Sequence, residues 1–125
     1  MSIEKLQPAD KGAVAVFMPY YQGAKRNFLP LAISLYQQGS LEGYRRIEGG
    51  ENIPFVATWF VSKLPSEITR CRLQFDSNAD LSYEVTMANS EFINYLIEVI
   101  MNFKRARLTD FSQQFYRKLL RRSDE

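Results

Sequence analysis

The side chains that most often carry enzyme chemistry are nearly absent from this chain of 125 residues, which has no histidine and one cysteine, Cys71. Without an imidazole neither a Ser-His-Asp nor a Cys-His site can form, and one thiolate cannot build a zinc site. Cys71 belongs to the apolar half of an alternating segment, which favours a packed thiol over a nucleophile. The sequence therefore predicts a protein that is not an enzyme, with no catalytic residue, no metal site and no cofactor.

Two short motifs resemble ligand-binding loops but fit turns better. The pair Gly49-Gly50 lacks the spacing, the lysine and the following helix of a phosphate-binding loop. The stretch from Asp76 to Asp80 has turn composition, without the glycine and the final acid of a calcium loop. Both motifs are predicted to join neighbouring strands.

Positive charge is concentrated at the end of the chain. Residues 1–100 hold nine Lys/Arg and eleven Asp/Glu, whereas residues 101–125 hold seven and three. Within residues 105–122, apolar side chains at 111, 115 and 119 form one seam and most cations lie opposite, which predicts an amphipathic helix. Its basic face can be merely solvated, dock a protein or bind RNA. Direct RNA contact is the least favoured use, because the aromatic residues are expected to face inward.

Arginine and tyrosine are enriched in the binding hot spots of protein interfaces, which selects two candidate docking segments. One is the strand segment that contains Tyr44, and the other is the outer face of the final helix. The candidate partner-docking residues are Tyr44, Arg45, Arg46, Tyr116, Arg117, Lys118, Arg121 and Arg122.

The hydrophobic pattern up to about residue 87 is mostly alternating, as in strands with one buried face. The segment 53–61 is apolar on both sides and is expected at the centre of the sheet. Six strands are expected, at residues 13–21, 28–37, 41–47, 53–61, 69–75 and 81–87.

The clearest predicted hairpin joins the last two of these strands. If its loop runs from residue 76 to residue 80, Phe75 faces Leu81 on the core side, and the same register places Arg72 opposite Glu84 on the solvent side. Burial of the apolar side is expected to fix this register, because one exposed ion pair contributes little.

The period becomes helical after residue 89. Asn89 or Ser90 can cap a helix over residues 91–106, in which polar residues form only a narrow stripe. A helix with so much apolar surface needs a second neighbour besides the sheet, either another subunit or the final helix. The final helix is expected to start at Thr109 or Asp110. For the first case the candidate self-association residues are Tyr95, Val99 and Phe103.

These elements predict an α+β fold with about six mainly antiparallel strands, in a sheet or a small barrel, followed by two C-terminal helices. One domain is expected over residues 1–125, with a flexible segment at 1–11. The first residues lack a secretory signal and no apolar stretch reaches bilayer length, so no membrane insertion and a cytoplasmic location are expected.

Most of the chain between about residues 12 and 105 resembles a known family. The segments LAISLYQQGSLEGYRRIEGG, IPFVATWFVS and RCRLQFDSNADLSYE are similar to the EbsA family of cyanobacterial type IV pilus biogenesis proteins. The resemblance implies a non-catalytic component that associates with an Hfq-like protein and with the pilus extension ATPase, PilB, at the cytoplasmic face of the pilus machinery. We therefore expect an adaptor or scaffold that can also form a homo-oligomer. The alternative is a small RNA-binding regulator that uses the basic final helix.

Overall fold

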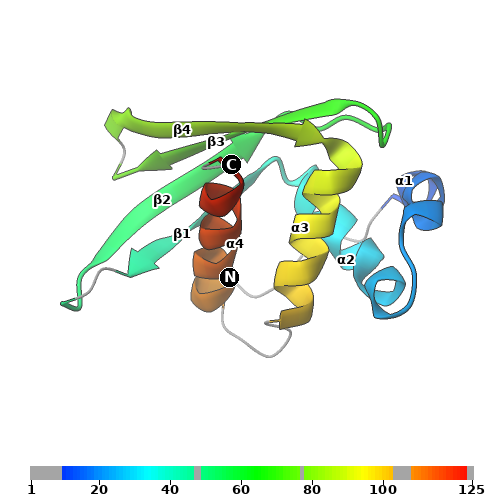
Figure 1. The fold of residues 1–125 in the computed structure, drawn as a ribbon, viewed down its shortest axis with the longest axis horizontal. Helices are drawn as coiled ribbons and strands as arrows, with labels where there is room; N and C mark the ends of the chain where they lie inside the picture. Colours follow the sequence, from blue (N-terminus) through cyan, green and yellow to red (C-terminus); the bar gives the residue numbers. More distant parts are fainter. Residues whose placement is uncertain (1–9, 47–48, 77, 103–107, 124–125) are drawn as a thin grey trace.

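The computed structural model describes residues 10–46, 49–76, 78–102 and 108–123. The four strands in these ranges form one antiparallel sheet in the order β1-β2-β3-β4. Helices α3 and α4 lie against one face of the sheet, with α2 beside α3 and α1 outermost (Figure 1). The predicted α+β class and the two C-terminal helices are confirmed. The elements are α1 (Lys11–Phe17), the 3-10 helix η2 (Met18–Tyr20), α2 (Ala24–Gln37), β1 (Ser40–Arg46), β2 (Asn52–Trp59), β3 (Ile68–Phe75), β4 (Asn78–Ala88), α3 (Asn89–Asn102) and α4 (Leu108–Ser123).

Two of the six expected strands are helices, so the prediction of six strands is wrong and the sheet has four. The segment 13–21 lies in α1 and η2, and the segment 28–37 lies in α2. The buried residues of α2 include Leu29 and Ile33 at helical spacing, but a short apolar run does not separate this pattern from strand alternation. Pro30 adds to the ambiguity, because proline is normally excluded from a helix interior, yet α2 continues through it.

Local signals mark both ends of the N-terminal helical region. The side chain of Asp10 accepts a hydrogen bond of 2.9 Å from the N–H of Gly12 and caps α1. At the other end Gly39 has a φ of +73°, which suits a glycine just after a helix. Its carbonyl accepts a 2.9 Å bond from the N–H of Trp59 and so joins the turn to β2. Residues 1–9 of the predicted flexible segment 1–11 lie outside the described residues. Its last two residues, Asp10 and Lys11, form the start of α1.

The hairpin of β3 and β4 has the predicted pairing over most of its length. Arg72 lies opposite Glu84, as expected. Just before the turn the register shifts, so Phe75 pairs with Asn78 and not with Leu81, which corrects the prediction. β4 therefore begins at residue 78 instead of 81, because an irregularity of the bulge type permits a shorter loop.

Trp59 lies at the centre of the core between the sheet and the helices. Its ring centroid is 5.1 Å from that of Phe92 in α3 and 5.9 Å from that of Phe115 in α4. Its indole N–H donates a 2.6 Å hydrogen bond to the carbonyl of Tyr36 in α2. One β2 residue therefore contacts all three of the longer helices. The position predicted for β2, inside the sheet, is confirmed.

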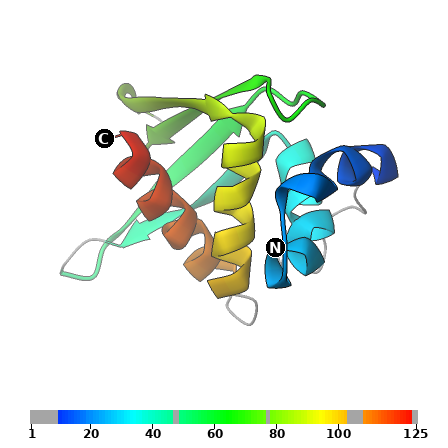
Figure 2. The same ribbon diagram turned by 45° about the vertical axis from the view of Figure 1, so that its right-hand side comes forward.

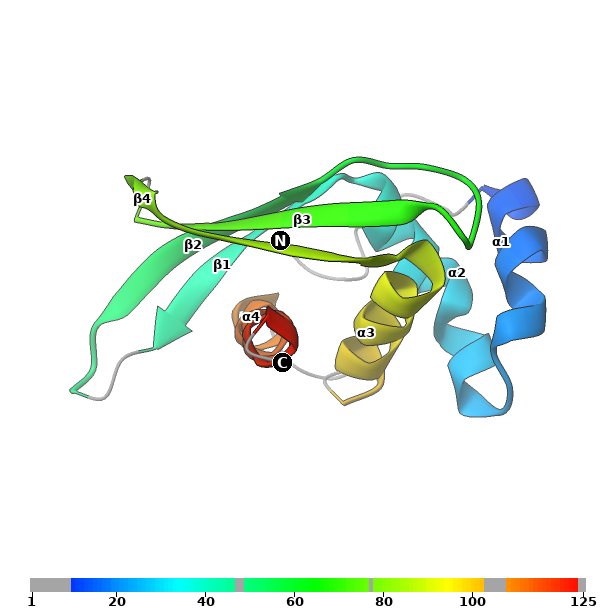
Figure 3. The same ribbon diagram turned by 45° about the horizontal axis from the view of Figure 1, so that its top comes forward.

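Helix α3 packs between α2 and α4 as well as against the sheet (Figure 2). The second apolar neighbour expected for it is therefore supplied by the final helix, and α2 adds a third that the sequence did not indicate. No helix in the described part of the chain covers the opposite face of the sheet (Figure 3). In the same part of the chain, no helix combines the length and the apolar character needed to cross a bilayer.

Candidate docking surface

The basic side of α4 is partly turned toward α3. The Nζ atom of Lys118 lies 3.4 Å from Oε2 of Glu98, and Nε of Arg122 lies 3.3 Å from Oε1 of Glu91. Because the two helices run antiparallel, the acid near the start of α3 meets the end of α4 (Figure 1). Two of the four cations predicted to dock a partner from α4 are thus paired within the chain.

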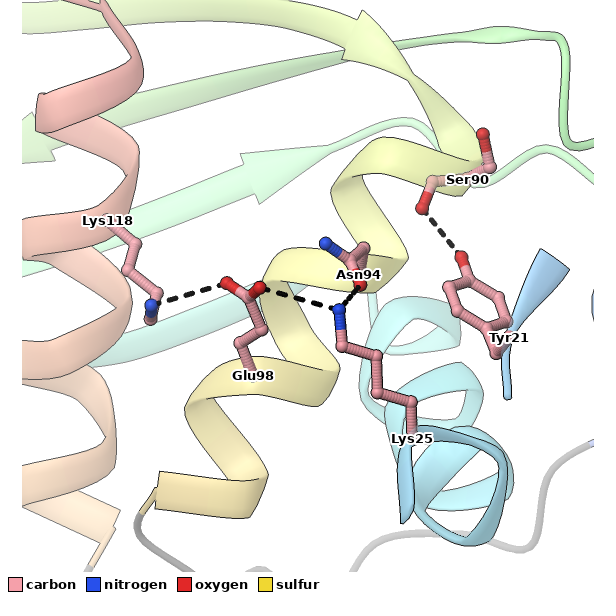
Figure 4. Close-up of polar contacts among 6 residues, drawn as sticks. All are labelled: Tyr21, Lys25, Ser90, Asn94, Glu98 and Lys118. Atoms are coloured by element: carbon pink, nitrogen blue, oxygen red, sulfur yellow. Dashed lines mark hydrogen bonds and ion pairs between the residues drawn. The ribbon is translucent and has the colours of Figure 1, made fainter. Parts of the chain in front are cut away.

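Glu98 joins three helices at one carboxylate. While one of its oxygens faces Lys118, the other lies 3.6 Å from Nζ of Lys25 in α2, as Figure 4 shows. The same ammonium donates a 2.9 Å hydrogen bond to the side-chain oxygen of Asn94. Because these groups are partly exposed, each ion pair contributes at most about 1 kcal/mol, and the arrangement mainly orients α2 and α4 around α3.

Arg117 and Arg121 are the predicted docking cations that remain on the outside of α4. They lie four residues apart, hence on one side of the helix, and both side chains are exposed. No ion pair joins either of them to a described residue. We call these two residues the basic helix surface, and it suits an acidic partner.

The other predicted docking residues do not share a surface with them. The ring of Tyr116 is buried, and its centroid lies 5.2 Å from that of Phe75. Arg45 covers this ring, with its guanidinium carbon 5.5 Å from the ring centroid, a cation–π geometry. Tyr44 comes directly before Arg45 in the strand, so its exposed side chain points to the opposite face of the sheet. The backbone of Arg46 pairs with that of Asn52, and its side chain lies outside the described residues.

The candidate self-association residues of α3 do not form an exposed patch. Val99 is fully buried within the chain, and Tyr95 is partly buried against the core. Phe103 lies outside the described residues. The broad apolar surface of α3 is covered by the neighbours already described, so it requires no second subunit.

Cys71 is packed in the core, as expected from its place in the alternating strand. The residue is fully buried in β3, and burial raises the pKa of its thiol to about 12. The thiol therefore stays protonated at neutral pH and is shielded from reagents in solution.

A group of exposed apolar residues was missed by the sequence reasoning. Phe60 is 82% exposed and Ile68 is 61% exposed, at the two ends of the connection between β2 and β3. The alternating pattern predicts a strand as far as residue 61, whereas β2 ends at Trp59. The polar stretch SKLPSE after it was the signal for a loop. We name this group the apolar loop patch; it consists of Phe60, Val61, Leu64 and Ile68.

The loop that carries the patch is fixed by a buried polar network. The side-chain amide of Asn89, the first residue of α3, donates a 2.6 Å hydrogen bond to the hydroxyl of Ser62 and accepts one from the hydroxyl of Thr69. The backbone N–H of Ser62 donates in turn to the hydroxyl of Tyr36 at 3.0 Å. The loop is therefore tied to α2 through Tyr36 and to α3 through Asn89, and Asn89 is in turn bonded to Thr69 of β3.

Two further bonds complete this attachment. The amide of Asn89 also donates to the carbonyl of Leu64 at 2.9 Å, and its backbone N–H donates to the carbonyl of Glu67 at 2.7 Å. Next to them the hydroxyl of Tyr21 donates to the carbonyl of Ser90 at 2.6 Å (Figure 4). Burial raises the pKa of that tyrosine above its ordinary value, so its hydroxyl remains a donor even in alkaline solution. The patch thus stands on a loop with a defined conformation.

The chain matches a known protein family. A family model described as "Type IV pilus, essential for biofilm suppression A-like" matches residues 6–123. The match spans every described element, from α1 to α4. No curated protein matches the chain.

Proposed function

The chain belongs to the EbsA-like family of type IV pilus proteins, and from this premise we propose that it acts as a non-catalytic adaptor in pilus biogenesis. Its proposed partners are an Hfq-like protein and the pilus extension ATPase, PilB, which it would meet in the cytoplasm at the base of the pilus machinery. An adaptor of this kind needs separate surfaces for separate partners, presented by a fixed frame.

The observation that carries the proposal is the presence of two chemically different exposed surfaces on one frame. The apolar loop patch is exposed yet its backbone is held by the Asn89 network. The basic helix surface lies on α4, which Glu98 and Glu91 hold against α3. One surface suits an apolar partner segment and the other an acidic one, so two partners can bind without competing.

Affinity capture of the tagged chain from its native cells tests the proposal. We expect the ATPase and the Hfq-like protein to be retained, with no loss after nuclease treatment. The double variant Phe60→Ser/Leu64→Ser should lose one partner, and Arg117→Glu/Arg121→Glu should lose the other. Tyr20→Ser is the matched control, because this exposed tyrosine of η2 belongs to neither surface.

Three results would contradict the adaptor. Neither partner is captured, or both double variants retain both partners, or the control variant loses them as well. Circular dichroism of each variant must match that of the wild type, so that a loss of binding is not a loss of folding.

The RNA-binding alternative is favoured by one observation, the two exposed arginines of the basic helix surface. It is opposed by the burial of Phe115 and Tyr116, since these aromatic rings are not free to stack on bases. If RNA is the ligand, retention of a labelled single-stranded RNA should fall steeply with salt and be lost in Arg117→Glu/Arg121→Glu. In the affinity capture, proteins held through bound RNA would be released by nuclease treatment.

A further inference from the structure

The apolar loop patch continues onto the open face of the sheet. Ile68 begins β3 and alternates with buried residues of that strand, so its exposed side chain points away from the helices. Trp59 pairs with Cys71, and one residue closer to the loop on each strand, Phe60 and Arg70 follow on the outer side. No helix in the described part of the chain covers this face (Figure 3). The patch therefore presents two large apolar side chains on an open surface.

Two cations border the patch. Lys63 directly precedes Leu64 in the loop, and Arg70 lies two residues after Ile68 on the same side of β3. Both cationic residues are exposed, and no ion pair joins either of them to a described residue. An exposed apolar patch with a polar rim is typical of a binding site for another macromolecule. Here the rim is positively charged.

The nearest acids along the sheet and the loop have other neighbours. The backbone N–H of Leu64 donates a 3.5 Å hydrogen bond to Oε2 of Glu67 inside the loop. Glu84 lies directly opposite Arg72, which is farther from the loop than Arg70. A partner that covers the patch would therefore gain affinity by bringing its own acids to the two cations of the rim.

We propose that the apolar loop patch binds an acidic amphipathic segment of a partner protein. Apolar side chains of this segment cover Phe60 and Ile68, and its carboxylates meet Lys63 and Arg70. The inference rests on the proposed function, since it names the chemistry by which one of the two adaptor surfaces selects its partner. Because the Asn89 network already fixes the loop, little conformational entropy is lost on binding.

A membrane surface fits the patch less well than a protein segment does. Recognition of anionic lipids normally takes a cluster of about four to eight Lys/Arg, whereas two cations border this patch. The outer side chains that lie beside Phe60 and Ile68 on the sheet are polar. They include Thr58, Arg72 and Thr86. Insertion of this face into a bilayer would bury these polar groups without partners.

Photo-crosslinking of the whole chain in its native cells tests what occupies the patch. Phe60 is replaced by p-benzoyl-phenylalanine, which keeps an aromatic ring at this position, and the crosslinked peptide is identified by mass spectrometry. We expect one protein segment in which apolar residues are interspersed with Asp or Glu. The same replacement at Tyr20 is the control, because this exposed tyrosine belongs to neither docking surface.

Four results would overturn the inference: no crosslink at residue 60, a crosslink to lipid or RNA, a protein segment without acids, or an equal crosslink from residue 20. The adaptor proposal fails in a different way. Its failure appears as the absence of the ATPase and the Hfq-like protein from the affinity capture, whatever segment is crosslinked at residue 60.

The charged rim is tested by titrating the purified crosslinked partner against the whole chain. Lys63→Glu/Arg70→Glu should weaken binding by about tenfold, because two attractive contacts become repulsive, and the loss should shrink at high salt. Lys63→Arg/Arg70→Lys keeps both charges and should bind like the wild type. Arg26→Glu is the matched control, because this exposed arginine lies at the start of α2, whereas the loop is bonded to Tyr36 near its end.

A charge exchange completes the test. Replacing the acids of the crosslinked segment by lysine should weaken its binding to the wild-type chain and restore its binding to Lys63→Glu/Arg70→Glu. Such a restoration requires direct contact between the two sets of charges and cannot come from a change in folding. If the double variant binds the unaltered partner like the wild type, or if the exchange restores nothing, the proposed acidic contacts are wrong.

Discussion

The two sides of α3 are held by different kinds of contact. Toward the sheet, Phe92 packs on Trp59 and Phe115, and all three rings are buried. Toward solvent, Glu98 is paired with Lys118 and Lys25, and these side chains remain partly exposed. Burial of large apolar side chains contributes several times more free energy than exposed ion pairs do. The inner side therefore supplies stability, and the outer side selects which helices stand beside α3.

The largest effect should come from the inner side. Trp59→Ala removes the ring on which α3 and α4 pack, together with its hydrogen bond to Tyr36. We expect the free energy of unfolding to fall by about 3 to 5 kcal/mol. Phe60, the exposed neighbour of Trp59, provides the control. Phe60→Ala should change the free energy of unfolding by less than about 0.5 kcal/mol. Urea unfolding followed by circular dichroism measures both, and equal losses would mean that the ring is not central to the fold.

The next effect concerns the junction where α3 begins. Asn89→Ala leaves the hydroxyls of Thr69 and Ser62 without their amide partner inside the protein, which should cost about 1 to 3 kcal/mol. Asn94→Ala, in the partly exposed stripe of the same helix, should cost much less. Hydrogen exchange at residues 60–67 should rise in the first variant alone. If it rises in neither, the network does not hold the loop.

A pH effect should come from the thiol behind the inner side. Burial raises the pKa of Cys71 from 9.0 to about 12, so the native chain keeps a proton that the unfolded chain releases first. The stabilising contribution is complete below pH 9 and is lost as the pH rises toward 12. Between pH 8 and pH 10 we expect a loss of about 1 kcal/mol.

Cys71→Ala provides the reference for this measurement. Its unfolding free energy, lower because a small cavity is left, should decline less over the same pH range. Tyr21, whose pKa is also raised by burial, contributes a decline of the same sign in both chains. Identical pH profiles for the two chains would show that the thiol does not contribute.

The smallest effect should come from the outer side. Glu98→Gln removes one charge from the contact with Lys25 and Lys118 and should cost less than about 1 kcal/mol. The cost should largely disappear in 1 M salt, because these charges are partly exposed. Glu51→Gln, at an exposed acid outside the contact, should have no such salt-dependent cost. A loss as large as that of Trp59→Ala would remove the distinction between the two sides.

The parts of the fold that the sequence predicted are those with a long or strict period. In the β3–β4 hairpin the alternation of Cys71, Leu73 and Phe75 with polar residues left one pairing, and Arg72 lies opposite Glu84 as expected. The helix after Asn89 was predicted because its apolar spacing continues over several turns. α2 was not, since a proline interrupts a run too short to separate the two periods.

The candidate docking surface was less predictable, because it depends on how elements distant in the sequence meet. The sequence places Lys118 and Arg122 on a basic face, but it does not show that the acids of α3 stand beside them. Likewise the exposure of Phe60 depends on where β2 ends, and the Asn89 network that fixes this loop comes from three separate elements. Arg117 and Arg121 stay on the outside of α4 as the sequence predicts, because both are exposed and no ion pair joins them to a described residue.

Trp59 also serves as an intrinsic fluorescent probe. It is the chain's single tryptophan, and it contacts side chains or backbone of α2, α3 and α4. Its fluorescence therefore reports whether the three helices are assembled on the sheet, without any attached label. The next residue, Phe60, belongs to the apolar loop patch. A partner bound to the patch would therefore lie close to the residue that carries the indole. A single intrinsic fluorophore can thus follow both the folding of the chain and the occupation of its loop.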